Sequence, residues 1–554
     1  MIPTDGLKRT GAAGGNPNGV KRAEGLVNVP TGQVPLALQK SSYRKLTRCS
    51  FSSAVAPGHD SYRMGLHKRN QMNIVLISTY ELGRQPFGLA SPAGWLRARG
   101  HEVTCLDLSR EALDEAAIRA AEVIAFYVPM HTATRLAAGL IAPVRGMNSR
   151  AHICFYGLYA PVNEEYLRGL GVGTILGGAF EEGLASLAAR LQHGAAHHNG
   201  EAAQTEPVIS LARQKFIVPD RAGMPELAKY ARVVMPGGEQ RIAGSTEATR
   251  GCKHLCRHCP IVPVYNGAFR VVEREVVLAD IRQQVVAGAQ HITFGDPDFF
   301  NGPAHALSIV EAMHREFPEL SYDVTIKIEH LRKHDSHLAR LRDTGCLFVI
   351  SAVESVNDLV LEKFDKGHTR ADFLAVAARF RELGMTLLPT FVPFTPWTTL
   401  EGYNDLLDVI AQHDLCENVA PIQLAIRLLI PAGSRLLELP DVRAMVGPFD
   451  PAALIFPWKH EDPRMDALCR EISELVQRGE KLKLSRTQIA SHIQRAARAA
   501  AGKGEMPGIP QSLPKGTPVP FLDEPWYCCA EPMNDQFVSI GKVKEVVAKA
   551  DQFV

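Results

Sequence analysis

The sequence lacks any run of about 18 apolar residues, the length expected of a transmembrane helix. It also has almost no net charge, because 61 Lys and Arg against 59 Asp and Glu give +2. Bulk charge therefore provides no argument for a nucleic-acid or membrane partner. With 46% hydrophobic and 22% charged residues, the 554-residue chain has the composition of a globular protein of roughly three or four domains.

The first 70 residues have few acids and no apolar segment of the kind found in secretory signals. They hold 11 Lys and Arg against three acids, together with Gly, Pro, Ser and Asn clusters. We predict that residues 1–70 form a disordered basic leader, with folded sequence beginning near Met72. An organellar transit peptide and an upstream extension both remain open for this segment.

Strand-like and helical segments alternate over residues 72–192, which predicts an α/β domain with a doubly wound parallel sheet. Residues 193–240 indicate a linker. A second alternating series over residues 241–436 predicts a partial (β/α)6 TIM-type barrel, and residues 437–554 a helical extension with a Cys-Cys tail. The strands expected for the barrel are Gly244–Ala248, His291–Phe294, Val324–Ile328, Phe348–Val353, Thr386–Val392 and Gln423–Leu429.

The 11 cysteines show no disulfide-like spacing, which favours a reducing compartment, and we expect the cytoplasm. Most are expected to pack as small apolar side chains. Two groups stand out for chemistry: Cys252, Cys256 and Cys259, and the adjacent pair Cys528 and Cys529.

Residues 249–260 read TRGCKHLCRHCP, so three cysteines follow C-x3-C-x2-C directly after the first predicted barrel strand. Three thiolates on one short loop can hold three irons of a cubane cluster and leave the fourth iron open to a small molecule. Zinc is the alternative; it would need a fourth protein ligand, for which His254 or His258 is available.

The three-cysteine loop and the barrel-like series resemble the radical SAM superfamily over roughly residues 240–435. The resemblance implies a [4Fe-4S] cluster on Cys252, Cys256 and Cys259, with S-adenosylmethionine (SAM) bound at the open iron. It also implies reductive cleavage of SAM to a 5′-deoxyadenosyl radical, a reaction whose chemistry belongs to the cofactors.

The same resemblance implies SAM contacts at the ends of successive barrel strands. The second strand ends in FGDPD where the family has Gly-Gly-Glu, the fourth ends in SAVES, and the sixth carries IRLLIP. His258 stands where the family usually has an aromatic residue packed on adenine. The residues expected to bind the cofactor are His258, Gly295, Asp296, Glu354, Arg427 and Ile430.

Lys327 and Glu329 are candidate substrate contacts, because residues i and i+2 of a strand point to the same side. A surface ion pair is the alternative.

The N-terminal domain resembles the cobalamin-binding domain of the B12-dependent radical SAM group, which implies cobalamin as a further cofactor to test. Two features depart from that group: Tyr156-Gly157-Leu158 replaces a Gly-Gly, and no Asp-x-His-x-x-Gly motif supplies a cobalt ligand. A domain that keeps the fold without cobalamin is equally compatible with these residues.

The tail, PWYCCAEP at residues 525–532, resembles a subgroup of radical SAM proteins that end in Cys-Cys-Ala-Glu-Pro. Two neighbouring thiolates suit a thiophilic partner such as As(III), Cu(I) or Hg(II). A hydrogen-atom donor to a substrate radical and a pair of incidental thiols are the alternatives. We expect Cys528 and Cys529 to be catalytic and to lie near the SAM site.

These observations predict a radical SAM enzyme, with a transferase as the favoured class, acting on a small-molecule substrate. The expected electron donor is a flavodoxin or ferredoxin, and no membrane or nucleic-acid partner is expected. The alternatives are a cobalamin-dependent radical SAM methyltransferase and, from another class, a non-catalytic iron–sulfur or metalloid-binding protein.

Overall fold

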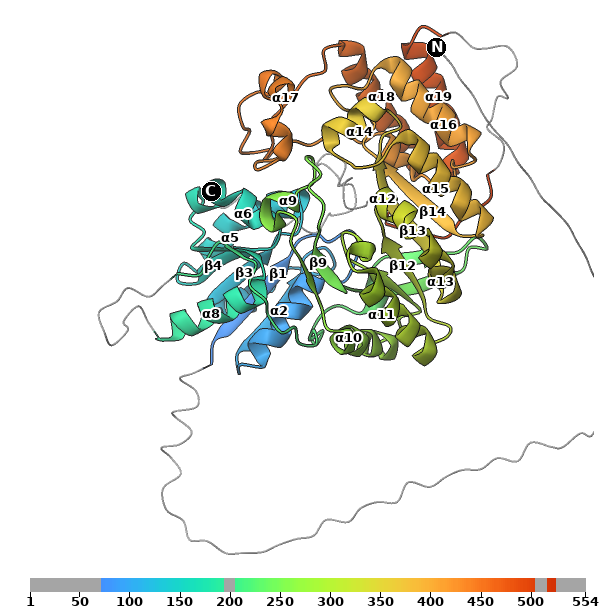
Figure 1. Ribbon diagram of the computed structural model, residues 1–554. Helices are drawn as coiled ribbons and strands as arrows, with labels where there is room; N and C mark the ends of the chain where they lie inside the picture. Colours follow the sequence, from blue (N-terminus) through green and yellow to red (C-terminus); the bar gives the residue numbers. More distant parts are fainter. Residues whose placement is uncertain (1–70, 194–204, 504–515, 525–554) are drawn as a thin grey trace, which may run out of the picture. The chain divides into compact units, whose positions relative to one another are not determined.

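The computed structural model describes residues 71–193, 205–503 and 516–524 (Figure 1). Its first sheet is parallel, in the order β2-β1-β3-β4-β5-β6. The chain adds β2 on one side of β1 and then β3 to β6 on the other, so the strand order switches between β1 and β3. Doubly wound sheets bind ligands at such a switch point. The strands are β1 (Asn73–Ser78), β2 (Glu102–Asp107), β3 (Val123–Tyr127), β4 (His152–Tyr156), β5 (Thr174–Gly178) and β6 (Ile209–Ser210). The predicted doubly wound sheet is confirmed.

Both faces of this sheet are covered by helices, because its strands are apolar on both sides (Figure 1). Leu76 of β1 packs into the core formed with α2 (Phe87–Arg97) and α8 (Phe180–His193). Ile77, the next residue, packs into the opposite core with α5 (Ile141–Met147). Burying each such side chain contributes about 1.5–3 kcal/mol. The other helices of this region are α3 (Glu115–Ala120), α4 (His131–Gly139), α6 (Tyr159–Val162) and α7 (Glu164–Gly169).

The second sheet has the order β14-β13-β12-β11-β8-β7-β15, and its five strands from β8 to β14 are parallel. This confirms the partial barrel. Its strands are β7 (Arg232–Val234), β8 (Gln240–Thr246), β11 (His291–Phe294), β12 (Ser321–Thr325), β13 (Cys346–Glu354), β14 (Thr386–Phe391) and β15 (Phe521–Leu522). The helices along it are α10 (Arg274–Val286), α11 (Pro303–Glu316), α12 (Ile328–Lys333), α13 (Leu338–Asp343), α14 (Asp358–Phe364), α15 (Arg370–Glu382) and α16 (Leu400–Gln412).

The sixth barrel strand, expected at Gln423–Leu429, is not formed. The chain instead makes a 3-10 turn, η5 (Pro421–Leu424), and pairs with the sheet edge only through a parallel bridge between Phe394 and Arg427. Pro421 has no N–H to donate to a strand ladder, and the Tyr403 hydroxyl holds the turn by donating to the Leu424 carbonyl at 2.8 Å.

The segment expected to link the two sheets contributes a strand to each. β6 extends the first sheet, and β7 pairs antiparallel with β8 in the second. A Pro-Gly-Gly turn at residues 236–238 joins β7 to β8, with Gly238 at φ +83° in the left-handed region.

The C-terminal extension is helical, as expected, with α17 (Pro440–Met445), α18 (Pro463–Lys481) and α19 (Arg486–Ala500). β15 then returns to pair antiparallel with β7. Within the three described ranges, no helix has both the length and the apolar composition required to cross a bilayer.

Candidate active site

The three-cysteine loop begins where β9 (Thr249–Gly251) ends. Gly251 is required there: its φ is +76°, and a Cβ would lie 2.5 Å from the Ala268 carbonyl oxygen. The loop is fastened at two more points. The backbone N–H of Arg257 donates to the Phe364 carbonyl at 2.9 Å, and the Asn301 side chain donates to the Gly251 carbonyl at 3.2 Å.

A cavity of about 250 Å³ brings Cys252, Cys256 and Cys259 together at its wall. It lies at the carboxyl ends of strands from both sheets, the edge at which both fold types place ligands. The lining residues from the carboxyl edge of the first sheet include Glu81, Leu82, Arg84, Tyr127, Gly157 and Tyr159. Those from the barrel include His254, His258, Gly295, Asp296, Asp298, Lys327 and Lys366.

Glu354 ends β13 as a fully buried carboxylate in a left-handed backbone conformation, with φ +69°. Its Oε1 accepts from His258 Nε2 at 3.0 Å and from Lys366 Nζ at 3.2 Å. Burial raises the pKa of Glu354, but Lys366 and His258 outweigh it and lower the pKa to about 2. Its Oε2 is also buried and has no hydrogen-bond partner among the described residues. Glu354 itself does not line the cavity, although its partners His258 and Lys366 do.

His258 lies between that carboxylate and an aromatic ring. Its imidazole stacks on Phe364 with ring centroids 4.3 Å apart. Burial lowers the pKa of His258 despite the neighbouring Glu354 carboxylate, so the ring is neutral at neutral pH. It can therefore donate from Nε2 to Glu354 without adding charge.

Asp296 follows β11 and ties the strand end to the start of the cysteine loop. Its carboxylate accepts from the Ala248 backbone N–H at 2.9 Å and from the Thr249 hydroxyl at 2.6 Å. Burial raises the pKa of Asp296 to about 7, although both hydrogen bonds oppose the shift. Gly295 beside it also lines the cavity.

The raised pKa of Asp296 predicts a pH-dependent contribution to stability. Between about pH 4 and pH 7 the native protein keeps this proton while the unfolded chain has lost it, so stability falls as the pH rises through that window. We expect the unfolding free energy of the parent, relative to Asp296→Asn, to fall by about 2 kcal/mol between pH 5 and pH 7. Urea titrations at both pH values measure this; an unchanged difference would contradict the prediction.

Arg427 and Ile430, expected at the cofactor site, do not line the cavity. The Arg427 guanidinium stacks 3.6 Å above the Trp458 ring and donates to Asp466 at 2.6 Å. Ile430 is fully buried, and its carbonyl accepts from the Phe456 N–H. Both residues connect the barrel to the C-terminal extension.

The expectation that Lys327 and Glu329 lie on a strand is wrong. β12 ends at Thr325, Lys327 is the residue before α12, and Glu329 lies in the first turn of that helix. Their side chains meet nevertheless, with Nζ and Oε2 3.0 Å apart, and Lys327 lines the cavity.

Arg250, which sequence reasoning did not single out, lies between the two sheets. Its guanidinium pairs with Glu181 of α8 at 2.5 Å and with Glu247 at 2.7 Å. The rings of Phe180 and Phe216 lie 4.8 and 5.2 Å from it. Its place two residues before Cys252 is the only signal in the sequence. Lys366, also missed, carries no motif signal, whereas Asp298 ends the FGDPD segment but was not expected to have a role of its own.

Comparison with known proteins agrees with this geometry. Residues 246–407 match the family model described as "Radical SAM superfamily", a range that contains the cysteine loop and strands β11 to β14. This part of the chain is a radical SAM domain. A radical SAM domain supports an enzyme and implies a [4Fe-4S] cluster and SAM as its cofactors.

Two curated relatives match the chain in part. The hopanoid C-3 methylase of Methylococcus capsulatus is 25% identical over 172 residues, which are 31% of this chain and 33% of the methylase. The ribosomal protein uS12 methylthiotransferase RimO of Geobacter sulfurreducens is 22% identical over 218 residues, 36% of this chain and 48% of RimO. The chain thus spans a third to a half of the length of these relatives.

The fold of the radical SAM domain together with the first sheet is found in a solved structure. OxsB, described as a cobalamin-dependent SAM radical enzyme with aqua-cobalamin and SAM bound, has a TM-score of 0.61 and 14% identity over 79% of this chain and 71% of OxsB. The N-terminal sheet therefore has a B12-binding-like fold. Cys528 and Cys529 lie outside the described residues.

Proposed function

We propose that this radical SAM enzyme holds its cluster on Cys252, Cys256 and Cys259 and cleaves SAM reductively to start radical chemistry on a small molecule. The observation that carries the proposal is that all three thiols and His258 lie at the wall of one cavity. His258 is hydrogen-bonded to the buried Glu354 carboxylate, whose second oxygen has no partner among the described residues. Three sulfurs on one loop suit three irons, and the unused oxygen suits a ligand hydroxyl.

The cofactors would supply the electron transfer and bond cleavage, and the chain's residues position and enclose the reactants. Glu354 is proposed to accept hydrogen bonds from ribose hydroxyls. Lys366 and His258 keep it ionised and oriented. Asp296 holds the strand end against the cysteine loop, and Lys327 with Glu329 presents an ion pair to the substrate.

Anaerobic reconstitution followed by a cleavage assay tests this function. The expected protein is brown, holds about four irons per chain, and converts SAM to 5′-deoxyadenosine when a reductant is added. Reduced flavodoxin or ferredoxin is the expected electron donor, in a reducing compartment such as the cytoplasm. A colourless protein that holds one zinc and leaves SAM intact would favour the non-catalytic metal-binding alternative.

Glu354→Gln is expected to weaken SAM binding by roughly 10- to 100-fold, the range for losing a charge-assisted hydrogen bond. Glutamine keeps the shape but removes the charge that Lys366 balances and to which His258 donates. Calorimetric titration of the reconstituted protein with SAM measures the change, with iron content as a check on the cluster. Glu438→Gln, at an exposed ion pair with Arg435, is the control. Equal SAM affinities in both variants would contradict the assignment.

Methyl transfer through cobalamin is the second candidate. The hopanoid methylase and the fold of OxsB favour it, and they also favour the transferase class. At the sheet's carboxyl edge, however, the Tyr156 ring lies 5.4 Å from Tyr127 and 5.2 Å from Phe180, and its hydroxyl donates to the Gly88 carbonyl. We expect SAM cleavage without added cobalamin. If activity strictly required hydroxocobalamin, methyl transfer through cobalamin would become the preferred function.

The tail cysteines are proposed to act at the same cavity, with a thiophilic acceptor such as trivalent arsenic. Glu524, the last residue described before the tail, accepts from the Tyr80 hydroxyl at 3.2 Å, next to Glu81 and Leu82 of the cavity wall. Four further residues reach at most about 14 Å, enough for Cys528 to approach the cavity.

We expect Cys528→Ser and Cys529→Ser to lower product formation at least about tenfold, since serine is a poor ligand for soft acceptors. SAM cleavage without product should persist in both variants. The yield of 5′-deoxyadenosine measures SAM cleavage, and mass spectrometry of the arsenical measures product formation. Parent-like turnover in both variants would show that these thiols are incidental.

A further inference from the structure

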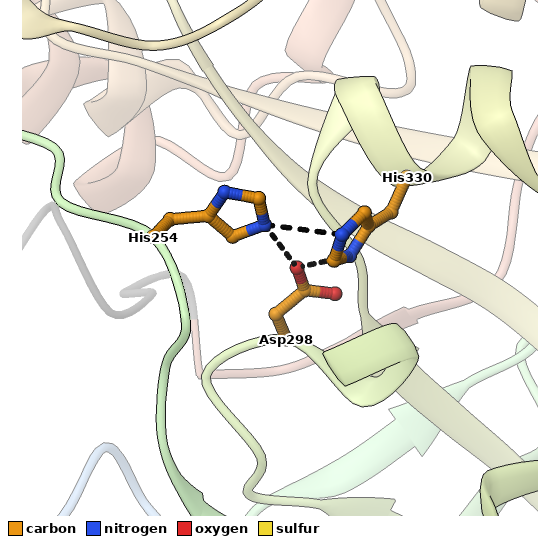
Figure 2. A group of neighbouring side chains, drawn as sticks. All are labelled: His254, Asp298 and His330. Carbon is orange, nitrogen blue, oxygen red and sulfur yellow. Dashed lines mark hydrogen bonds and ion pairs between the residues drawn. The ribbon is translucent and has the colours of Figure 1, made fainter. Parts of the chain in front are cut away.

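Three side chains from separate elements converge beside the cysteine loop (Figure 2). His254 comes from the loop itself, Asp298 from the turn after β11, and His330 from α12. One donor atom of each lies within 4.8 Å of those of the other two. The two Nε2 atoms are 3.1 Å apart, and Asp298 Oδ2 lies 3.5 Å from His254 Nε2.

The contacts within this trio leave donor atoms facing one another. His330 Nδ1 and Asp298 Oδ2 are 2.6 Å apart but are not aligned as a hydrogen bond, and neither has another hydrogen-bond partner among the described residues. His330 is 1% exposed and Asp298 2%, so water does not reach them freely. A cation bound between these side chains would give the buried carboxylate oxygen and ring nitrogen a partner.

Neighbouring groups hold the donors in place. Asp298 Oδ1 accepts from the Phe300 backbone N–H at 3.1 Å, which leaves Oδ2 for the imidazoles. On its far side, His254 Nδ1 lies 3.2 Å from Lys327 Nζ and 3.5 Å from Glu329 Oε2, so this ion pair holds the ring in place with Nε2 towards Asp298 and His330.

We propose that His254, Asp298 and His330 bind a divalent transition-metal ion, separate from the iron–sulfur cluster. Two imidazoles and one carboxylate are typical ligands of Zn²⁺ and Fe²⁺ and do not suit a hard cation such as Mg²⁺. Donor atoms that share an ion at about 2.1 Å stand roughly 3.0–3.4 Å apart. His254 Nε2 lies 3.1 Å from His330 Nε2 and 3.5 Å from Asp298 Oδ2, close to that range, whereas Asp298 Oδ2 and His330 Nδ1 are closer, at 2.6 Å.

The ion would face the cavity, because His254 and Asp298 both line it. Three protein ligands leave at least one coordination position for water or for an anionic oxygen of the substrate. This site gives the radical SAM domain a second means of holding a substrate, independent of the tail cysteines.

Zinc loading of the tag-free, full-length, cluster-reconstituted protein tests the proposal. After adventitious metal has been removed, we expect about one zinc per chain in addition to the cluster iron. Zinc K-edge X-ray absorption should show nitrogen and oxygen at about 2.0–2.1 Å with imidazole scattering, and no sulfur at about 2.3 Å. The spectrum of the parent decides the ligand type whether or not a variant folds.

Two variants then assign the ligands. Asp298→Asn keeps an oxygen for the Phe300 N–H, and His330→Ala removes one imidazole; each should weaken zinc binding at least about tenfold while iron content stays unchanged. His337→Ala, in the next turn beyond α12, is the matched control and should bind zinc like the parent. No zinc uptake by the parent, sulfur in the zinc shell, or equal loss in the His337 control would each overturn the proposal.

Discussion

Cys256→Ala is expected to lower SAM cleavage by at least about a thousandfold, because a cluster that loses one of three thiolates loses the assembly on which the chemistry depends. Cys256 is the middle cysteine of the loop, is buried, and shares one cavity with Cys252 and Cys259. The variant should lack the brown colour and absorption near 400 nm and hold well under four irons per chain. Iron analysis and 5′-deoxyadenosine yield measure both effects.

Cys346→Ala is the matched control for this prediction. Cys346 is also a buried cysteine, but it begins β13, whereas the cavity lies at the carboxyl ends of the strands. Its loss removes one small apolar group and should leave iron content and cleavage unchanged. A Cys256 variant that retains a full cluster and cleaves SAM would refute the assignment of the cluster to this loop.

Arg250→Ala is expected to destabilise the protein by about 3–5 kcal/mol, the range for removing one partner of a buried ion pair. The guanidinium is 6% exposed, and its loss leaves Glu181, which is fully buried, without its ion pair to Arg250. Burial lowers the pKa of Arg250, but Glu181 and Glu247 outweigh it and raise the pKa, so the charge is permanent. Urea unfolding of the cluster-free protein measures the loss.

Two further variants separate the ion pair from the packing. Arg435→Ala, at an exposed pair with Glu438, should cost no more than about 1 kcal/mol. The double variant Arg250→Ala with Glu181→Ala should recover part of the lost stability, since it removes the uncompensated carboxylate as well. A loss for Arg250→Ala as small as that of the exposed control would contradict this account.

Local patterns in the sequence predicted the elements of both sheets well. β11 has the bounds expected from its apolar run, His291–Phe294, because a buried parallel strand is apolar on both faces. The sixth barrel strand was not predictable in this way: residues 423–429 are apolar enough for a strand, but Pro421 and the Tyr403 hydrogen bond hold a 3-10 turn.

The functional residues were likewise predictable where the signal is local and unpredictable where it depends on contacts distant in sequence. Spacing along one loop predicted three candidate cluster cysteines, because C-x3-C-x2-C is a local pattern, and all three line one cavity. Lys366 and Arg250 were not predicted from the sequence. The partner of Lys366 is Glu354, 12 residues away, and that of Arg250 is Glu181, 69 residues away, and no local period marks such pairs.

The sequence by itself indicated the class of chemistry, because three cysteines within eight residues suit a metal-binding loop wherever the chain carries it. It also determined the order of strands and helices, because apolar runs and helical periods are local properties. Only the tertiary structure decided which side chains surround that loop. His254, Asp298 and His330 meet because the carboxyl ends of parallel strands gather at one edge of the barrel, which brings together residues up to 76 positions apart.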